Sequence, residues 1–278
     1  MLFIVGNKDM GSCAGKKSQS SSAPLRTTVK NPDSQSINAS SPPLSKFSDL
    51  RDFYTREGSH MNRKVKTCFD QVFAGESSQI CEINLKFINL GEAGMAQLAV
   101  VLPAFKGLKS LRLWKTKLGV LGAKRLATAL PKLPLIEVLS LEDNDIRVEG
   151  MASISLGVPH IPLLKELYLH VNRLGLEGVS ALSAALTSKS NLEALTLDEN
   201  QVTNEGLAVL LKALTSSMPV LAHLGLGFNM LTDAGAGEVL KVLDDMPELK
   251  KLTLSGNEIS AKMENRLAKA APKLHIAY

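Results

Sequence analysis

Aromatic residues are scarce in this sequence. Phe, Trp and Tyr together make up 4% of its 278 residues, and there is a single Trp. Hydrophobic residues still account for 45%, an ordinary share for a globular protein, which excludes a largely disordered chain. The core of the folded part must therefore be built from Leu, Ala, Val and Ile.

Cysteines and long apolar runs are also scarce. The three cysteines, Cys13, Cys68 and Cys81, show neither the pairing of a disulfide framework nor the spacing of a metal site. They are typical of a reducing compartment, and we interpret Cys68 and Cys81 as small buried apolar residues. No apolar stretch approaches the roughly 18 residues of a membrane span. We therefore expect a cytoplasmic protein.

Motifs of catalysis are absent from the sequence. His-Glu-x-x-His, Cys-x-x-Cys, Gly-x-Ser-x-Gly and phosphate-loop patterns do not occur. These absences favour a noncatalytic protein without a cofactor or a metal ion. The positive charge is concentrated near the N-terminus. Residues 1–78 contain 11 basic and 7 acidic residues, whereas residues 79–278 contain 21 basic and 20 acidic residues. A nearly neutral repeat region argues against nucleic-acid binding.

Residues 1–46 are rich in Ser and Pro and lack apolar periodicity, so we predict a disordered, basic segment. Within this segment, Met10–Ser18 resembles a myristoylation signal. If translation starts at Met10, Gly11 would be acylated, Cys13 could carry a second acyl chain, and the protein would attach to the cytosolic face of a membrane. If translation starts at Met1, Gly11 is never a terminus. The sequence leaves both alternatives open.

The chain repeats itself from Ile80 onward. Asparagines that follow a Leu-x-Leu pair recur every 28 or 29 residues, and Thr116 and Ile88 hold the same place in the two preceding units. Seven copies result, covering residues 80 to about 272. The asparagines of the repeat are Asn144, Asn172, Asn200, Asn229 and Asn257.

Each copy predicts one strand and one helix. Leu195 and Leu197 alternate with other residues, as in a strand with one buried face. The following stretch, Leu207–Leu214, has leucines at the spacing of an amphipathic helix. One unit cannot bury its own apolar side, so the copies must stack into a continuous core. Residues 47–79, with an amphipathic pattern from Val65 to Phe73, are predicted to form a helical N-terminal cap.

The pattern Leu-x-x-Leu-x-Leu-x-x-Asn is complete in Leu192–Asn200, and the chain resembles the leucine-rich repeat family. Its long period resembles the ribonuclease-inhibitor subclass. The resemblance implies an α/β solenoid, an open horseshoe arc with a parallel β-sheet on the concave face and α-helices on the convex face. Residues 80–278 would hold seven repeats and a short C-terminal cap. We interpret the asparagines as a structural ladder that hydrogen-bonds loop backbone groups.

Strand residues between the core leucines are expected to line the concave face. They include the only Trp and one Tyr, which, like Arg, are typical anchors of protein interfaces. Basic residues come first and acidic residues lie in the middle, a pattern suited to a protein partner. The alternative is a solvated sheet with scattered exposed aromatics. The predicted partner-binding residues are Arg112, Trp114, Glu142, Asp143, Tyr168, His170, Asp198, Glu199 and Phe228.

A second function stays open beside that of a noncatalytic interaction scaffold. The repeats are also similar to those of the Ran GTPase-activating protein family, which accelerates hydrolysis on its partner through the loop edge of the solenoid. Leu167–Gly175 is similar to the asparagine-rich repeat segment of that family. However, Val171 replaces a second asparagine, Arg173 replaces a glycine, and the family's acidic tail is missing. This resemblance implies a Ran-like small GTPase as the alternative partner.

Overall fold

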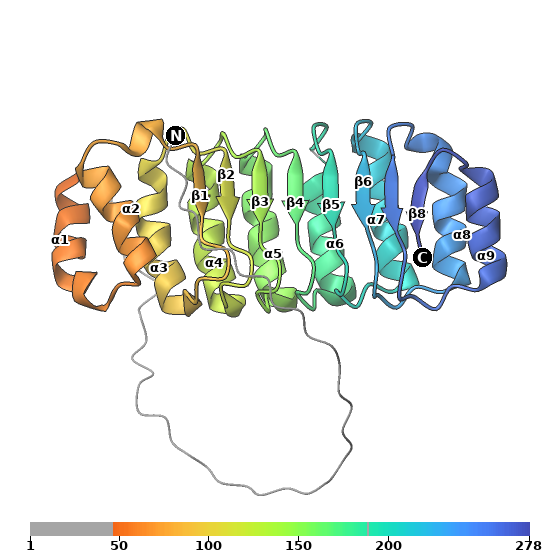
Figure 1. Ribbon diagram of the computed structural model, residues 1–278, viewed down its shortest axis with the longest axis horizontal. Helices are drawn as coiled ribbons and strands as arrows, with labels where there is room; N and C mark the ends of the chain where they lie inside the picture. The colour runs from red at the N-terminus through yellow and green to blue at the C-terminus, as the bar shows by residue number, and fades with distance from the viewer. Residues whose placement is uncertain (1–46, 188) are drawn as a thin grey trace, which may run out of the picture. The chain divides into compact units, whose positions relative to one another are not determined.

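The computed structural model describes residues 47–187 and 189–278. The predictions for residues 1–46, including lipidation at Gly11 and Cys13, lie outside this part of the chain. After two initial helices, strands and helices alternate (Figure 1). The strands are β1 (Glu82–Asn84), β2 (Ser110–Arg112), β3 (Val138–Ser140), β4 (Glu166–Tyr168), β5 (Ala194–Thr196), β6 (His223–Gly225), β7 (Lys251–Thr253) and β8 (His275–Ala277).

Most strands are followed by an α-helix, and several helices continue into a short 3-10 helix. The α-helices are α1 (Phe47–Glu57), α2 (Arg63–Phe73), α3 (Gly91–Val101), α4 (Gly119–Ala129), α5 (Arg147–Gly157), α6 (Gly175–Leu186), α7 (Asn204–Ser217), α8 (Asp233–Val242) and α9 (Ala261–Ala270). The 3-10 helices are η1 (Gly58–His60), η2 (Ser77–Gln79), η3 (Leu102–Ala104), η4 (Leu130–Lys132), η5 (Val158–His160) and η6 (Leu243–Asp245).

The strands form one parallel sheet in chain order, β1 to β8. The register repeats, so that Leu111 lies opposite Leu139 and Leu139 opposite Leu167. Helices α3 to α9 form a second layer behind the sheet (Figure 1). Packed helices need about 8–10 Å and strands only about 4.8 Å, so the sheet takes the inner, concave side of the stack. This architecture confirms the predicted leucine-rich repeat solenoid.

The core lies between these two layers. The second strand leucine of each middle repeat, such as Leu141 or Leu169, is fully buried, as are the helix residues Leu126 and Ile154 that face the strands. Burying one such side chain contributes about 1.5–3 kcal/mol. Small residues bring neighbouring helices together: a Cβ at Gly150 would meet the Cβ of Ala123 in the preceding helix at 3.0 Å. Gly122 and Gly178 also lie close to the preceding helix, so glycine at this position serves helix packing in the middle repeats.

The repeat asparagines lie in the loops that follow the strands. Asn172 shows their bonding: its Nδ2 donates to the carbonyl oxygens of Leu141 (2.9 Å) and Leu169 (2.8 Å), and its Oδ1 accepts the Asn144 N–H (3.2 Å). The other four make equivalent bonds to their own and the preceding repeat. Thr116 lies at the first end of this series, where its hydroxyl donates to the Leu113 carbonyl at 2.8 Å. Each amide thus links two neighbouring units.

The two described cysteines differ in exposure. Cys68 is buried in α2, and burial raises the pKa of its thiol to about 12. Cys81 is exposed, so the expectation that both are buried was wrong for Cys81. It precedes β1 at the register position that Lys109 and Glu137 hold in the next repeats, where side chains face solvent.

Lys189 is a buried lysine at a core position. Its side chain is 2% exposed, and its Nζ donates to the carbonyl oxygens of Ile161 (3.1 Å) and Pro159 (3.3 Å). Burial lowers the pKa of its ammonium group. Within residues 47–187 and 189–278 it forms no ion pair. Apolar side chains hold the same place in other repeats: Phe105, Leu133, Ile161, Met218 and Met246.

We predict that Asn200→Ala lowers the free energy of unfolding by about 3 kcal/mol, because it leaves buried carbonyl and N–H groups without partners. Asn257→Ala removes equivalent bonds at a half-buried site, where water replaces them, so it should cost only about 1 kcal/mol. Urea denaturation of both variants measures the difference. If both variants lose the same free energy of unfolding, burial is not the reason that Asn200 contributes more than Asn257.

Lys189→Met should raise the free energy of unfolding at pH 7, because methionine fills the same space without a buried charge. A lysine with a lowered pKa binds fewer protons when folded than when unfolded. Its penalty therefore shrinks as pH rises from its lowered pKa toward the unfolded value of about 10.4. The gain from Lys189→Met should accordingly be larger at pH 7 than at pH 10. Urea titrations of both proteins at the two pH values test this, and a gain independent of pH would contradict it.

Candidate functional site

The sheet face is the concave surface formed by the outward side chains of the strands. Three positions per repeat contribute to it, at every second residue. Sequence analysis identified the second and third positions, such as Arg112 and Trp114, but missed the first. That first position includes Glu82, Glu166 and His223. The same alternation, followed one step further toward the N-terminus, would have found them.

Trp114 is the centre of an aromatic cluster, which consists of Phe87, Trp114, His170 and the ammonium group of Lys86. The Phe87 and Trp114 rings are 4.9 Å apart between centroids, and Trp114 meets His170 edge-on at 5.7 Å. Lys86 Nζ lies 5.4 Å from the centre of the Trp114 ring, a cation–π contact. The cluster spans the first four repeats, and Phe87 remains 61% exposed. It therefore presents aromatic surface that is held in place by its own contacts.

Glu142 was predicted to bind a partner, but its side chain is only 5% exposed. It lies between Trp114 and His170 in the register, and those two rings touch across it. Its carboxylate accepts a short hydrogen bond from the Ser140 hydroxyl. Glu142 thus lies beneath the aromatic cluster, and the prediction that it is available to a partner was wrong because it is buried.

Two ion pairs join charged residues of the sheet face. Arg112 Nε lies 3.3 Å from Glu82 Oε1, and Lys115 Nζ lies 3.1 Å from Asp143 Oδ2. The predicted contrast between a basic start and an acidic middle is therefore partly neutralised, because Lys115 and Asp143 belong to opposite groups. These exposed pairs contribute about 1 kcal/mol or less to stability.

Tyr168 and His223 are half-buried polar groups on the same face. The Tyr168 hydroxyl donates to Glu166 Oε2 at 2.8 Å. Burial is the larger cause and this hydrogen bond the second, and together they raise the pKa of Tyr168 to about 12. Burial also lowers the pKa of His223, with a smaller contribution from Lys251. Tyr168 stays a neutral donor at physiological pH, and the imidazole of His223 is biased toward its neutral form.

In every repeat, the residue before the asparagine position has a left-handed backbone conformation. Ile88 and Thr116 hold that asparagine position in the first two repeats. Non-glycine residues adopt this conformation at a cost of roughly 1 kcal/mol, so each must be held by its surroundings. At Glu199 and Phe228 it directs exposed side chains outward at the end of the sheet face. The residues with positive φ at this position are Phe87, Lys115, Asp143, Val171, Glu199, Phe228 and Gly256. Sequence periodicity gave no signal for this conformation, because its residue types vary.

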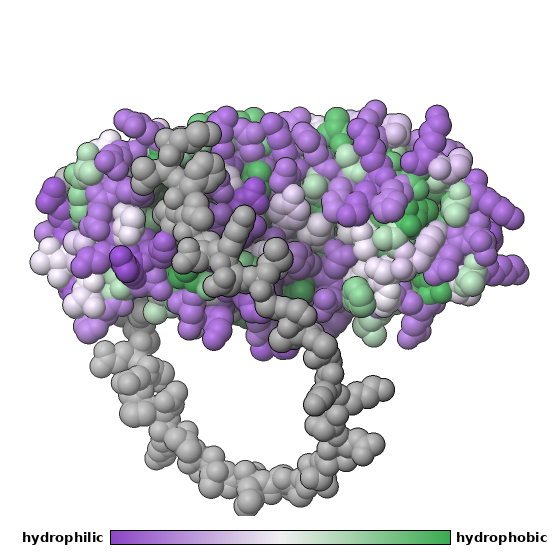
Figure 2. Space-filling view, viewed as in Figure 1, coloured by the Kyte–Doolittle hydropathy of each residue, from purple (hydrophilic) through white to green (hydrophobic). Residues whose placement is uncertain are grey.

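The predicted binding residues do not all meet. The aromatic cluster brings Trp114 and His170 together. Arg112 lies on β2, two residues before Trp114, and Tyr168 lies on β4, two residues before His170. Asp198 lies three strands beyond Trp114, roughly 14 Å away at the usual strand spacing. Figure 2 shows that the visible part of this side is largely hydrophilic, with scattered hydrophobic residues toward the C-terminal end. The aromatic cluster and the acidic residues Asp198 and Glu199 therefore lie on separate parts of the face.

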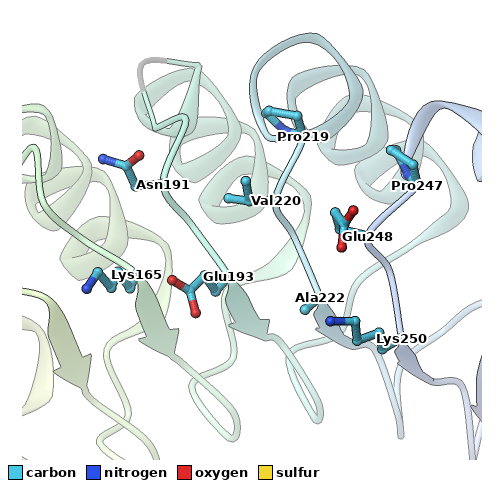
Figure 3. Close-up of a pocket in the computed structure, with 9 residues that line it drawn as sticks. All are labelled: Lys165, Asn191, Glu193, Pro219, Val220, Ala222, Pro247, Glu248 and Lys250. Carbon is cyan, nitrogen blue, oxygen red and sulfur yellow. The ribbon is translucent and has the colours of Figure 1, made fainter.

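A cavity of about 610 Å³ lies at a different place, along the edge where the strands begin. Figure 3 shows Glu193, Ala222 and Lys250 at the strand starts, with Pro219, Val220 and Pro247 nearer the helices. None of the predicted partner-binding residues lines it. On the same edge, Glu137 bridges Lys109 (3.0 Å) and Lys165 (2.8 Å), and these hydrogen bonds lower the pKa of Glu137.

The described residues hold no group of three or more His, Cys, Asp or Glu side chains placed to bind a metal ion. Their helices are too short or too polar to cross a membrane.

Comparisons with known proteins agree with the repeat. A family model described as leucine-rich repeat matches residues 132–155 and 188–211. No curated protein matches the chain.

Three solved structures show similarity at low identity. A protein from Bacteroides fragilis has 17% identity over 74% of this chain and 71% of its own, with a TM-score of 0.42. The actin-binding site 2 of leiomodin-1 has 18% identity over 55% and 88%, with a TM-score of 0.45. Mex67:Mtr2 subunits from Chaetomium give 20% identity over 37% and 69%, with a TM-score of 0.29. None of the TM-scores reaches 0.5, so the assignment depends on the repeats, their register and the family match: the chain is a leucine-rich repeat protein.

Proposed function

We propose that this protein is a noncatalytic scaffold that binds a protein partner through its sheet face. The observation that carries the proposal is the aromatic cluster around Trp114. Its rings are fixed by mutual contacts and yet present Phe87 at 61% exposure. Binding such a surface costs little side-chain entropy, because the rings are already held. Tryptophan, tyrosine and arginine are the residues that most often dominate binding energy at protein interfaces.

The surroundings of the cluster suit a rim that fixes orientation. Arg112 and Glu82 form an ion pair on the first two strands, and Tyr168 with Glu166 forms a hydrogen-bonded pair on the fourth. Polar groups around an apolar centre exclude water and select the partner's register. The proposed binding residues are therefore Arg112, Trp114, Tyr168 and His170, joined by Phe87 and Lys86.

Trp114→Ala combined with Tyr168→Ala should abolish capture of the partner, because the double variant removes the largest anchors of the face. Affinity purification with the intact chain and with this variant measures the effect. Leu121→Ala combined with Leu156→Ala is the matched control, since it removes exposed apolar side chains from the helix layer. An identical set of captured proteins for the intact chain and the Trp114/Tyr168 variant would refute the proposal.

Attachment to the cytosolic face of a membrane is a further part of the proposal, and it depends on sequence alone. A single myristoyl chain binds membranes only marginally, so Cys13 or the lysines Lys16 and Lys17 would supply the second signal. Gly11→Ala, expressed from the full reading frame, should move the protein from the membrane fraction to the supernatant. Unchanged fractionation would exclude the lipid anchor, but it would not contradict the proposed binding of a partner by the sheet face.

A GTPase-activating function is the weaker alternative. It is carried by the similarity of Leu167–Gly175 to a family segment, and the polar groups there already have structural partners. Asn172 belongs to the asparagine series, and Arg173 Nη1 lies 3.4 Å from Asp145 Oδ1. The scaffold function therefore has the stronger support.

A further inference from the structure

Charged side chains alternate along the edge where the strands begin. The residue directly before each strand lies at this edge, and before β2, β3, β4 and β5 it is Lys109, Glu137, Lys165 and Glu193. The ammonium groups of Lys109 and Lys165 bond Glu137 from its two sides, at 3.0 and 2.8 Å. Opposite charges at neighbouring positions thus neutralise each other along this edge.

Ala222 interrupts the alternation before β6, and Lys250 follows it before β7. Glu193 therefore has a cation beside it on one side only, and that cation, Lys165, already bonds Glu137. In the described part of the chain, neither Glu193 nor Lys250 forms an ion pair. The interruption leaves two unpaired charges of opposite sign on the two sides of a methyl group.

The cavity of about 610 Å³ at this edge lies at the interruption. Glu193, Ala222 and Lys250 stand at the starts of three neighbouring strands (Figure 3). In the four preceding repeats, a lysine or glutamate side chain occupies the place that the methyl group of Ala222 leaves open. The cavity is therefore a local exception to the repeat pattern.

The walls of this cavity carry both apolar and charged side chains. Pro219, Val220 and Pro247 lie nearer the helices (Figure 3), and Val220 is 40% exposed. Two lysines and two glutamates also line the cavity, so its walls have no net charge. A lining of this kind favours a ligand that combines an apolar group with charges of both signs.

We propose that the cavity binds an extended segment of a partner protein that carries a basic and an acidic residue three positions apart. The basic residue pairs with Glu193, the acidic residue pairs with Lys250, and a residue between them packs on Ala222 and Val220. This inference goes beyond the proposed function, because none of the predicted partner-binding residues lines the cavity.

The spacing of three residues follows from strand geometry. Adjacent strands lie about 4.8 Å apart, so the backbones of Glu193 and Lys250, two strands apart, are separated by about 9.6 Å. A polyproline II segment has three residues per turn and rises about 3.1 Å per residue, which puts residues i and i+3 on one face about 9.3 Å apart. Residues that share a face of a β-strand lie only about 6.7 Å apart.

Charge complementarity requires both signs in the segment. A segment with basic residues alone would pair with Glu193 and be repelled by Lys250, and an acidic segment would meet the reverse. An apolar segment would remove water from both charged groups without replacing the lost hydrogen bonds. A segment with both charges at the stated spacing satisfies the two groups at once.

The probes for the test come from a displayed library of random 12-residue peptides. Selection uses the full-length chain with Trp114→Ala and Tyr168→Ala, which lacks the largest anchors of the sheet face. We expect the selected peptides to share a basic and an acidic residue three positions apart. Binding of a synthetic peptide from this pool to the wild-type chain is then measured by fluorescence anisotropy.

Ala222→Lys should weaken binding of this peptide at least about tenfold. The new side chain supplies the lysine that the alternation omits, so it fills the cavity and pairs with Glu193. Cys81→Lys is the matched control, because it adds the same charge at the equivalent exposed position of the first repeat. It should change binding by less than about twofold.

Glu193→Gln and Lys250→Met should each weaken binding about threefold to fivefold, the effect typical of one exposed ion pair. With a peptide whose basic residue is replaced by alanine, Glu193→Gln should have no further effect, because the pair is already lost. This alanine peptide should also bind the wild type about threefold to fivefold more weakly than its parent. That comparison needs no variant of the protein, so it holds even where a variant fails to fold.

Three results would overturn the inference: no peptide is selected, the selected peptides lack the paired charges, or Ala222→Lys binds them as tightly as the wild type does. Opposite charges seven positions apart would indicate a bound helix and would also overturn the extended segment. Because selection proceeds without the anchors of the sheet face, each of these results leaves the proposed function standing. Loss of partner capture with the Trp114/Tyr168 variant, in turn, tests only the sheet face.

Discussion

Mutual burial between neighbouring repeats is the constraint on which the rest of this structure depends. A single strand-and-helix unit has an apolar side that it cannot cover, so each unit is stable only between two others. The repeat asparagines add a polar counterpart to this stacking. In Asn172, one amide group satisfies carbonyl oxygens of two successive units and accepts the N–H of Asn144. Apolar packing and hydrogen bonding thus impose the same repeat distance.

This constraint leaves the sheet face free to vary. Core leucines fix one side of each strand, while the alternate positions only need to avoid collisions with their neighbours in the next strand. Large and small residues are therefore distributed unevenly: Trp114 and His170 make contact above Glu142, whereas Gly225 and Gly227 leave the space that the Asp198 carboxylate fills. The same backbone carries a cluster of aromatic rings at one part of the face and a carboxylate packed on two glycines at another. We infer that function resides in this variation.

Particular residues show where sequence reasoning was limited. The leucine and asparagine periods predicted the strands, their order and the layer of helices, because each residue's role depends on neighbours at a fixed spacing. Glu142 was misjudged, since its burial results from two rings that belong to other repeats. Cys81 was misjudged as well, because its position follows the solvent-facing pattern of Lys109 and not that of the core. Lys189 illustrates the opposite case, a charged residue accepted into a core position by two backbone carbonyls.

The sequence by itself determined the solenoid: a period of 28 or 29 residues, repeated with leucines and asparagines in place, admits one way of burying its apolar sides. Only the tertiary structure decided which polar groups are paired and which are left for a partner. That decision depends on contacts between residues about 28 or 56 positions apart, such as the Trp114–His170 contact over Glu142 and the position of Asp198 over Gly225. Such contacts depend on side-chain volume and direction across strands, which a periodic pattern along one chain does not contain.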